Sequence, residues 1–150
     1  MPEKKTIERA RQAEAEGKAP STQAGEFVRE EIEHIREGKH GARSTRQAIA
    51  IGLSKARRAG IKLPPPSKRA VSQETRDKAE REYERAQGGG RKPTSGKRSR
   101  ATTRALRREG QAAASTKALS KQARSAAHRR SRTSRSQAAR KAARTRAKNS

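Results

Sequence analysis

The residues best suited to carry chemistry are three ionisable side chains at helical spacing. Glu30, His34 and Glu37 recur so that one face of a helix would present all three, as some metal ligands are presented. One short helix supplies fewer ligands than a stable site needs, so we expect a solvated histidine beside carboxylates and no bound metal. His40 and His128 lie in basic stretches and are expected at the surface.

Patterns for catalysis and nucleotide binding are absent from the sequence. The chain has no Cys, which excludes disulfides, thiolate metal sites and cysteine catalysis. A phosphate-binding loop would need Gly five residues before Gly96 and Ser or Thr after Lys97, but Arg91 and Arg98 occupy these positions. No nucleophile, base and orienting group can be assembled. We therefore predict a protein that is not an enzyme and needs no cofactor.

Charge is the strongest signal. The 40 Lys and Arg against 15 Asp and Glu give a net charge of +25. Residues 91–150 hold 20 basic and one acidic side chain, whereas residues 1–63 hold 14 and nine and residues 64–90 hold six and five. Basic side chains gain free energy by displacing counterions from a polyanion, so the last sixty residues predict a nucleic-acid-binding tail.

The candidate phosphate contacts are Arg and Lys side chains of this tail. Fourteen of its 20 basic residues are Arg, which can contact phosphate with two parallel hydrogen bonds. We expect largely sequence-independent contacts, to DNA more than RNA, through Arg91, Lys97, Arg98, Arg100, Arg104, Arg107, Arg108, Arg124, Arg129, Arg130, Arg132, Arg135, Arg140, Lys141 and Arg144.

The elements that must position these residues are helical. Ile, Leu, Val and Phe number only 13 of 150 residues, too few for one packed domain of this length. The predicted class is all-α: a helical hairpin and isolated short helices, with a largely disordered basic C-terminal tail that gains helix on binding. The predicted parts are a flexible segment (1–20), the hairpin (21–63), a Pro linker with a charged helix and a Gly joint (64–90), and the tail (91–150).

Local signals define the hairpin. Ser21 and Thr22 offer a start for the first helix and Gly38 a left-handed end, while Ser44 and Gln47 form a capping box that opens the second helix. Gly60 ends that helix, and three prolines follow. A Gly inside a helix is unfavourable, so Gly52 predicts a close helix crossing. Because the hairpin has few apolar residues to stabilise it, we also expect self-association or a protein partner.

Read as a helix-turn-helix, the hairpin could also bring basic residues near a nucleic-acid backbone. The residues concerned are Arg46, Lys55, Arg57 and Arg58. Residues 46–60, RQAIAIGLSKARRAG, resemble the signature of a domain-of-unknown-function family of small basic bacterial proteins. A longer subgroup with an Ala/Arg/Ser-rich tail is similar over most of the chain. The resemblance implies a bacterial source and, loosely, DNA binding.

These patterns favour a non-enzymatic, nucleoid-associated or histone-like DNA-binding protein. Two alternatives stay open: a protein-interaction adaptor that acts through the hairpin, and an RNA- or ribosome-associated protein. The longest apolar run is four residues, 48–51, so the sequence predicts no membrane span and a cytoplasmic location at the nucleoid.

Overall fold

The computed structural model describes residues 2–89 and 95–150. Within these ranges every regular element is a helix, which confirms the all-α prediction. Gly90, predicted as part of a joint, and Arg91, a candidate phosphate contact, lie outside the described residues. The elements are α1 (Lys4–Ala15), α2 (Pro20–Arg36), α3 (Thr45–Arg58), α4 (Gln73–Gln87), α5 (Gly96–Arg107), the 3-10 helix η1 (Ala112–Ala114), α6 (Thr116–Arg129) and α7 (Arg132–Lys148).

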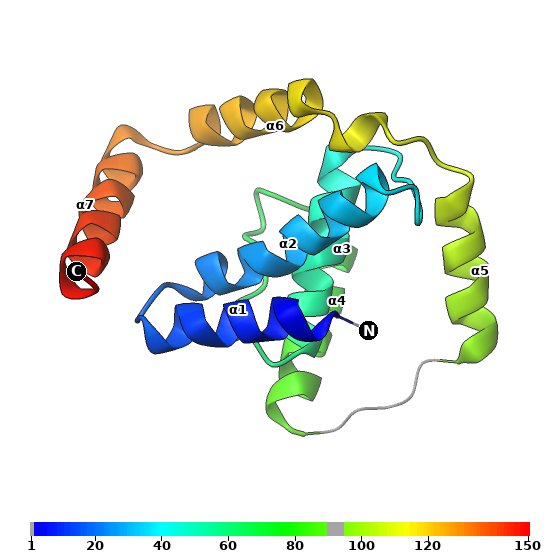
Figure 1. Cartoon of the computed structure of the whole chain (residues 1–150), viewed down its shortest axis with the longest axis horizontal. Helices are drawn as coiled ribbons and strands as arrows, with labels where there is room; N and C mark the ends of the chain where they lie inside the picture. Colours follow the sequence, from blue (N-terminus) through cyan, green and yellow to red (C-terminus); the bar gives the residue numbers. More distant parts are fainter. Residues whose placement is uncertain (1, 90–94) are drawn as a thin grey trace.

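Helices α1–α4 form a bundle in which each helix packs on the next along the chain. Helix α2 lies between α1 and α3, and α4 packs on α3 (Figure 1). Helices α5, α6 and α7 run around the edge of this bundle, with α5 and α7 on opposite sides of it in the view of Figure 1. The described chain thus consists of a bundle and an outer belt of helices.

Most of the local signals predicted for the hairpin are confirmed, but the start predicted at Ser21 or Thr22 is wrong. Gly38 has a φ of 75° and follows Glu37, the C-cap of α2, where a left-handed residue lets the chain leave the helix. The Ser44 side chain accepts from the Gln47 backbone amide at 3.2 Å and caps α3. The first hairpin helix begins one residue before the predicted cap: Pro20 is its first residue and Ala19 its N-cap, because proline suits the first helical position.

Gly52 lies at the predicted close crossing of α2 and α3. A Cβ placed on Gly52 would stand 2.6 Å from the Val28 Cα atom and 2.9 Å from its nitrogen. Real Cβ atoms do not approach backbone atoms so closely, so the two helices can lie at this separation only with glycine here. The close packing of the two helices therefore explains why a residue with low helix propensity occupies position 52.

The core consists of two clusters built mainly from small side chains. One joins Ile32 and Ile35 of α2 to Ala42 and Ala48 and to η1. The other surrounds Phe27 with Ala10 of α1, Ala24 of α2 and Ala56 of α3. Because alanine lets helix backbones approach closely, a chain with few large apolar residues still closes a core.

The N-terminal segment differs from the flexible stretch expected over residues 1–20. Residues 4–15 form α1, which buries Thr6, Ala10 and Ala13 against α2. These three positions lie on one face of the helix. The face is made of small side chains rather than large apolar ones, so its hydrophobic pattern is weak in the sequence.

The basic tail also differs from the largely disordered segment expected. Its described residues, 95–150, fold into α5, η1, α6 and α7. Serine side chains cap α6 and α7, since Ser115 accepts from the Ala118 amide at 3.2 Å and Ser131 from the Ser134 amide at 3.1 Å. Alanine and arginine, which dominate these helices, are strong helix formers.

Residues 106–119 are integral to the bundle rather than part of a separate tail. The Gly41 amide donates to the Leu106 carbonyl oxygen at 2.9 Å, and the buried Thr45 hydroxyl donates to the Ala113 carbonyl oxygen at 2.6 Å. Arg36 donates from Nε to the Ala114 carbonyl oxygen at 2.9 Å. The folded body therefore continues past the boundary predicted at residue 91. None of the helices over the described residues is both long and apolar enough to span a bilayer.

Candidate nucleic-acid interface

The candidate interface is the surface of α5, α6 and α7, which we call the basic belt. Over residues 95–150 it carries 18 Lys and Arg side chains and one acidic side chain, Glu109. No residue within α5, α6 or α7 themselves is buried, and these three helices contain no acidic residue. Apart from Glu109, the belt is thus a solvated surface of one charge sign.

The predicted phosphate contacts of the described tail are all exposed on the belt. On and directly after α5 lie Lys97, Arg98, Arg100, Arg104, Arg107 and Arg108. On α6, α7 and their junction lie Arg124, Arg129, Arg130, Arg132, Arg135, Arg140, Lys141 and Arg144. Four basic residues that were not among the predicted contacts are exposed on the belt as well, although the composition that selected the others applies to them too: Lys117, Lys121, Arg146 and Lys148.

The charges of the belt have no acidic partners among the described residues. All ion pairs over the described residues lie between residues 3 and 55, outside the belt; one example is Arg29 with Glu33 at 3.0 Å. Basic side chains three or four residues apart in a helix repel each other by a few tenths of a kcal/mol per pair. A polyanion laid along the belt would replace that repulsion with attraction.

Two of the four basic residues predicted for the hairpin are engaged inside the fold. Lys55 donates from Nζ to the buried Glu31 carboxylate. Arg57 is buried and donates to the carbonyl oxygens of Leu63 and Pro64, both at 3.3 Å. Burial lowers the pKa of the Arg57 guanidinium. Both side chains stabilise the bundle, which leaves them poorly placed for phosphates.

The other two hairpin residues are accessible. Arg46 is exposed at the start of α3, and Arg58 is exposed at its end, where its Nε donates to the Ser54 carbonyl oxygen at 3.3 Å. The two residues are three helical turns apart. They can add contacts at the two ends of α3, but they do not form one patch with Lys55 and Arg57.

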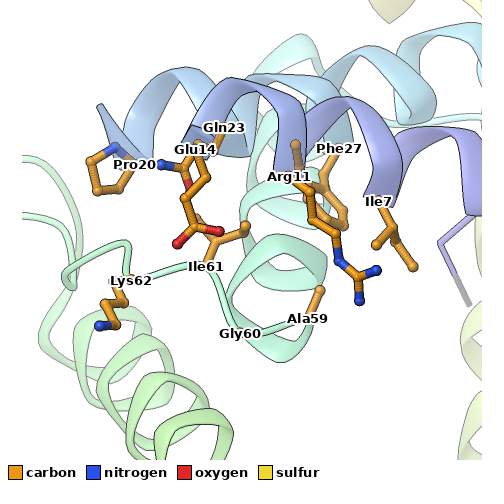
Figure 2. Close-up of a pocket in the computed structure, with 11 residues that line it drawn as sticks. Ile7, Arg11, Glu14, Pro20, Gln23, Phe27, Ala59, Gly60, Ile61 and Lys62 are labelled. Atoms are coloured by element: carbon orange, nitrogen blue, oxygen red, sulfur yellow. The ribbon is translucent and has the colours of Figure 1, made fainter. Parts of the chain in front are cut away.

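The bundle has a pocket of about 220 Å³ between α1, α2 and the end of α3 (Figure 2). Ile7, Phe27 and Ile61 line it, and the charged side chains of Arg11 and Lys62 lie at its edge. This mixture of apolar and charged groups is the feature of the bundle on which a protein-interaction role would rest.

Comparison with known protein families finds a match only for the N-terminal part of the chain. Residues 4–69 match a family of unknown function (DUF6496). The matched range contains α1, α2 and α3 and includes residues 46–60, so the predicted relation to an uncharacterised domain family is supported over this range. Helices α4–α7, and with them the basic belt, lie outside the match. No curated protein and no solved structure matches the chain.

Proposed function

We propose that the protein binds nucleic acid, DNA in preference to RNA, through the basic belt, largely without sequence specificity and without catalysis. The observation that supports this most is the combination of 18 exposed or solvated basic side chains with the absence of an acidic partner for any of them among the described residues. Such charges gain free energy from counterion release when they meet phosphates. The function fits a nucleoid-associated protein of the bacterial cytoplasm, from the longer, Ala/Arg/Ser-tailed subgroup of its family.

Helix α7 is the element best suited to a duplex. Arg132, Arg135, Arg140, Lys141 and Arg144 are distributed around its whole circumference rather than along one stripe. A helix of 17 residues is about 25 Å long and fits the major groove of B-DNA, where phosphates flank it on both sides. The major groove of A-form RNA is too narrow and deep for a helix, which favours DNA.

The bundle supports the belt rather than binding phosphate itself. Residues 1–63 are nearly balanced in charge, with 14 basic and nine acidic side chains, and Lys55 and Arg57 are occupied within the fold. Its hydrogen bonds to residues 106–114 hold the middle of the belt in place. Arg46 and Arg58 add peripheral contacts.

Binding should also increase the helix content of the belt. Helices α5 and α7 bury no side chain, so little tertiary packing opposes the mutual repulsion of their charges. Phosphates remove that repulsion. Adding duplex DNA to the full chain should therefore increase the helical circular dichroism signal, and an unchanged signal would contradict this part of the proposal.

The decisive experiment measures affinity for a random-sequence DNA duplex as a function of salt. If about eight belt residues contact phosphate, log K falls with log salt at a slope near −7. A variant with five belt charges replaced by Gln should flatten the slope by about 4 to 5 if all five make contacts. The five positions are Arg132, Arg135, Arg140, Lys141 and Arg144.

The control variant removes the same charge from the exposed surface of the N-terminal part. It replaces Lys4, Lys5, Arg11, Arg43 and Lys62 with Gln. Both variants have the same net charge, so a general effect of charge would weaken them equally, and that outcome would refute binding through the belt. Tighter binding to an RNA duplex than to DNA would favour the RNA alternative, and full affinity of the belt variant would favour an adaptor role.

A further inference from the structure

A second cluster of ionisable side chains lies inside the bundle, independent of the basic belt. Glu31 and His34 are three residues apart on α2, and His40 reaches them from the loop that follows. The Glu31 side chain is 1% exposed, and those of His34 and His40 are 15% and 12% exposed. One ligand atom from each residue lies within 4.8 Å of the others. His40 is thus largely enclosed, in contrast to the surface position expected.

The cluster differs from the helical face considered in the sequence. Glu37 pairs with Lys39 at 2.9 Å, and a Glu30 carboxylate oxygen accepts from the Glu3 backbone amide at 3.0 Å. His34 instead faces Glu31 on its own helix and His40 from the loop, whose ring meets it edge-on with centroids 6.2 Å apart. Folding brings together donors that helical spacing alone does not.

Hydrogen bonds on the outer side fix which ring nitrogens face inward. His34 Nε2 lies 3.0 Å from Glu3 Oε1, and His40 Nδ1 lies 2.9 Å from the Gly41 carbonyl oxygen. A carboxylate and a carbonyl oxygen can only accept, so these two nitrogens carry the protons. In the neutral imidazoles, the opposite nitrogens, His34 Nδ1 and His40 Nε2, present their lone pairs toward Glu31. Histidines that bind metals have this arrangement, with the outer N–H held by a carboxylate or carbonyl.

Glu31 supplies an oxygen that the fold leaves without a hydrogen bond. Its Oε1 accepts from Lys55, while its Oε2 is buried and accepts no hydrogen bond within the described part of the chain. Oε2 nevertheless lies 3.1 Å from His40 Nε2. Two lone pairs at this distance repel each other unless a cation lies between them, and a buried acceptor without a partner is unfavourable by about 1–3 kcal/mol.

We propose that Glu31 Oε2, His34 Nδ1 and His40 Nε2 bind one divalent transition-metal ion, preferentially Zn²⁺, with water in the fourth position. Two imidazoles and one carboxylate form a donor set that zinc accepts. Tetrahedral ligands at about 2.0–2.1 Å lie about 3.3 Å apart, close to the separation of the His40 and Glu31 atoms. The ligand atoms of the three residues lie within 4.8 Å of one another, so the His34 ring would need only a small inward movement, and Lys55 can keep Glu31 Oε1.

The ion would act as a clamp between α2 and the loop over residues 38–43. Gly41 and Ala42 of that loop donate backbone hydrogen bonds to Leu106 and Gly110, so the clamp would also support the attachment of the belt. A bound ion stabilises the folded state by mass action. Metal binding can be measured without nucleic acid, independently of the proposed function.

The test titrates Co²⁺ into the full chain and follows the visible absorption of four-coordinate cobalt, then displaces it with Zn²⁺ and measures the heat of zinc binding. We expect a stoichiometry of one and a spectrum that zinc abolishes. The variant H40Q should weaken zinc binding by at least 100-fold. E3Q removes the carboxylate that holds the outer N–H of His34 and should weaken binding by about 10- to 100-fold. Lower pH should weaken binding, because both imidazoles must be unprotonated to bind the metal.

The matched control is H128Q, which removes the remaining histidine from an exposed position on α6 and should leave zinc binding unchanged. Circular dichroism measures whether H40Q remains folded. If H40Q is unfolded, the cobalt spectrum of the wild-type chain still decides the question. A chain without a four-coordinate cobalt spectrum, or H40Q and H128Q chains that bind zinc equally well, would overturn the proposal and leave a proton on His40 as the cation between the two groups.

Discussion

The crossing of α2 and α3 at Gly52 predicts that a single added methyl group destabilises the protein. In G52A the new Cβ would meet the Val28 Cα at 2.6 Å and the Val28 nitrogen at 2.9 Å, so the helices must separate. Overpacking of this kind costs about 1–3 kcal/mol, and backbone atoms that cannot rotate away favour the upper end. Alanine regains about 1 kcal/mol of helix propensity. The net expectation is a loss of about 2 kcal/mol.

The chain contains its own control for this prediction. Gly25 lies in the interior of α2 with nothing within 4 Å of an added Cβ. G25A should therefore gain the higher helix propensity of alanine without a steric clash, and it should stabilise the protein by about 0.5–1 kcal/mol. Thermal unfolding followed by circular dichroism should place G52A about 4–8 °C below the wild type and G25A above it, given about 2–4 °C per kcal/mol for a chain of this size. If both substitutions raise the melting temperature, the close crossing is not a packing constraint and the reasoning fails.

Two further substitutions test the attachments of η1 and of the N-terminus. T45V removes the buried hydroxyl that donates to the Ala113 carbonyl oxygen. Because a buried acceptor then loses its partner, the free energy of unfolding measured in urea should fall by about 1–3 kcal/mol. An unchanged urea midpoint would show that this hydrogen bond does not hold η1. The hydrogen bond from His34, assisted by the charge of Lys39, lowers the pKa of the Glu3 carboxyl below its usual value. The stability that the ionised Glu3 contributes is present above the usual Glu pKa of about 4.3 and disappears as the pH falls through the lower pKa of the folded state. The difference in stability between wild type and E3Q should therefore shrink on acidification. A difference that does not change with pH would show that the pairing is absent.

Helix ends could be predicted because their causes are local. Gly38, Ser44 and Gly60 act on the backbone within a few residues, and each functions in the structure as its type and position suggest. Gly52 could also be interpreted, since a glycine inside a helix is unfavourable unless another backbone approaches it. The partner that approaches, Val28, is known only from the structure.

Helix α1 and the docking of η1 could not be predicted, because both depend on alanine. Ala10, Ala113 and Ala114 are among the most buried residues of the chain, yet alanine is equally common on the exposed faces of α6 and α7. A pattern of alanines therefore does not indicate which face is buried. That choice is made by which other backbone comes close enough to cover it.

The sequence by itself determined the sign and position of the charge, the helical class, the C-terminal end of α2 and both ends of α3, since these follow from composition and from interactions within one or two turns. Only the tertiary structure decided which charges are available. It buries Arg57, pairs Lys55 with Glu31 and leaves the belt without acidic partners among the described residues. It also brings His40 to Glu31 and His34. Partner choice over long sequence separations depends on how helices pack, and spacing along the chain does not specify that packing.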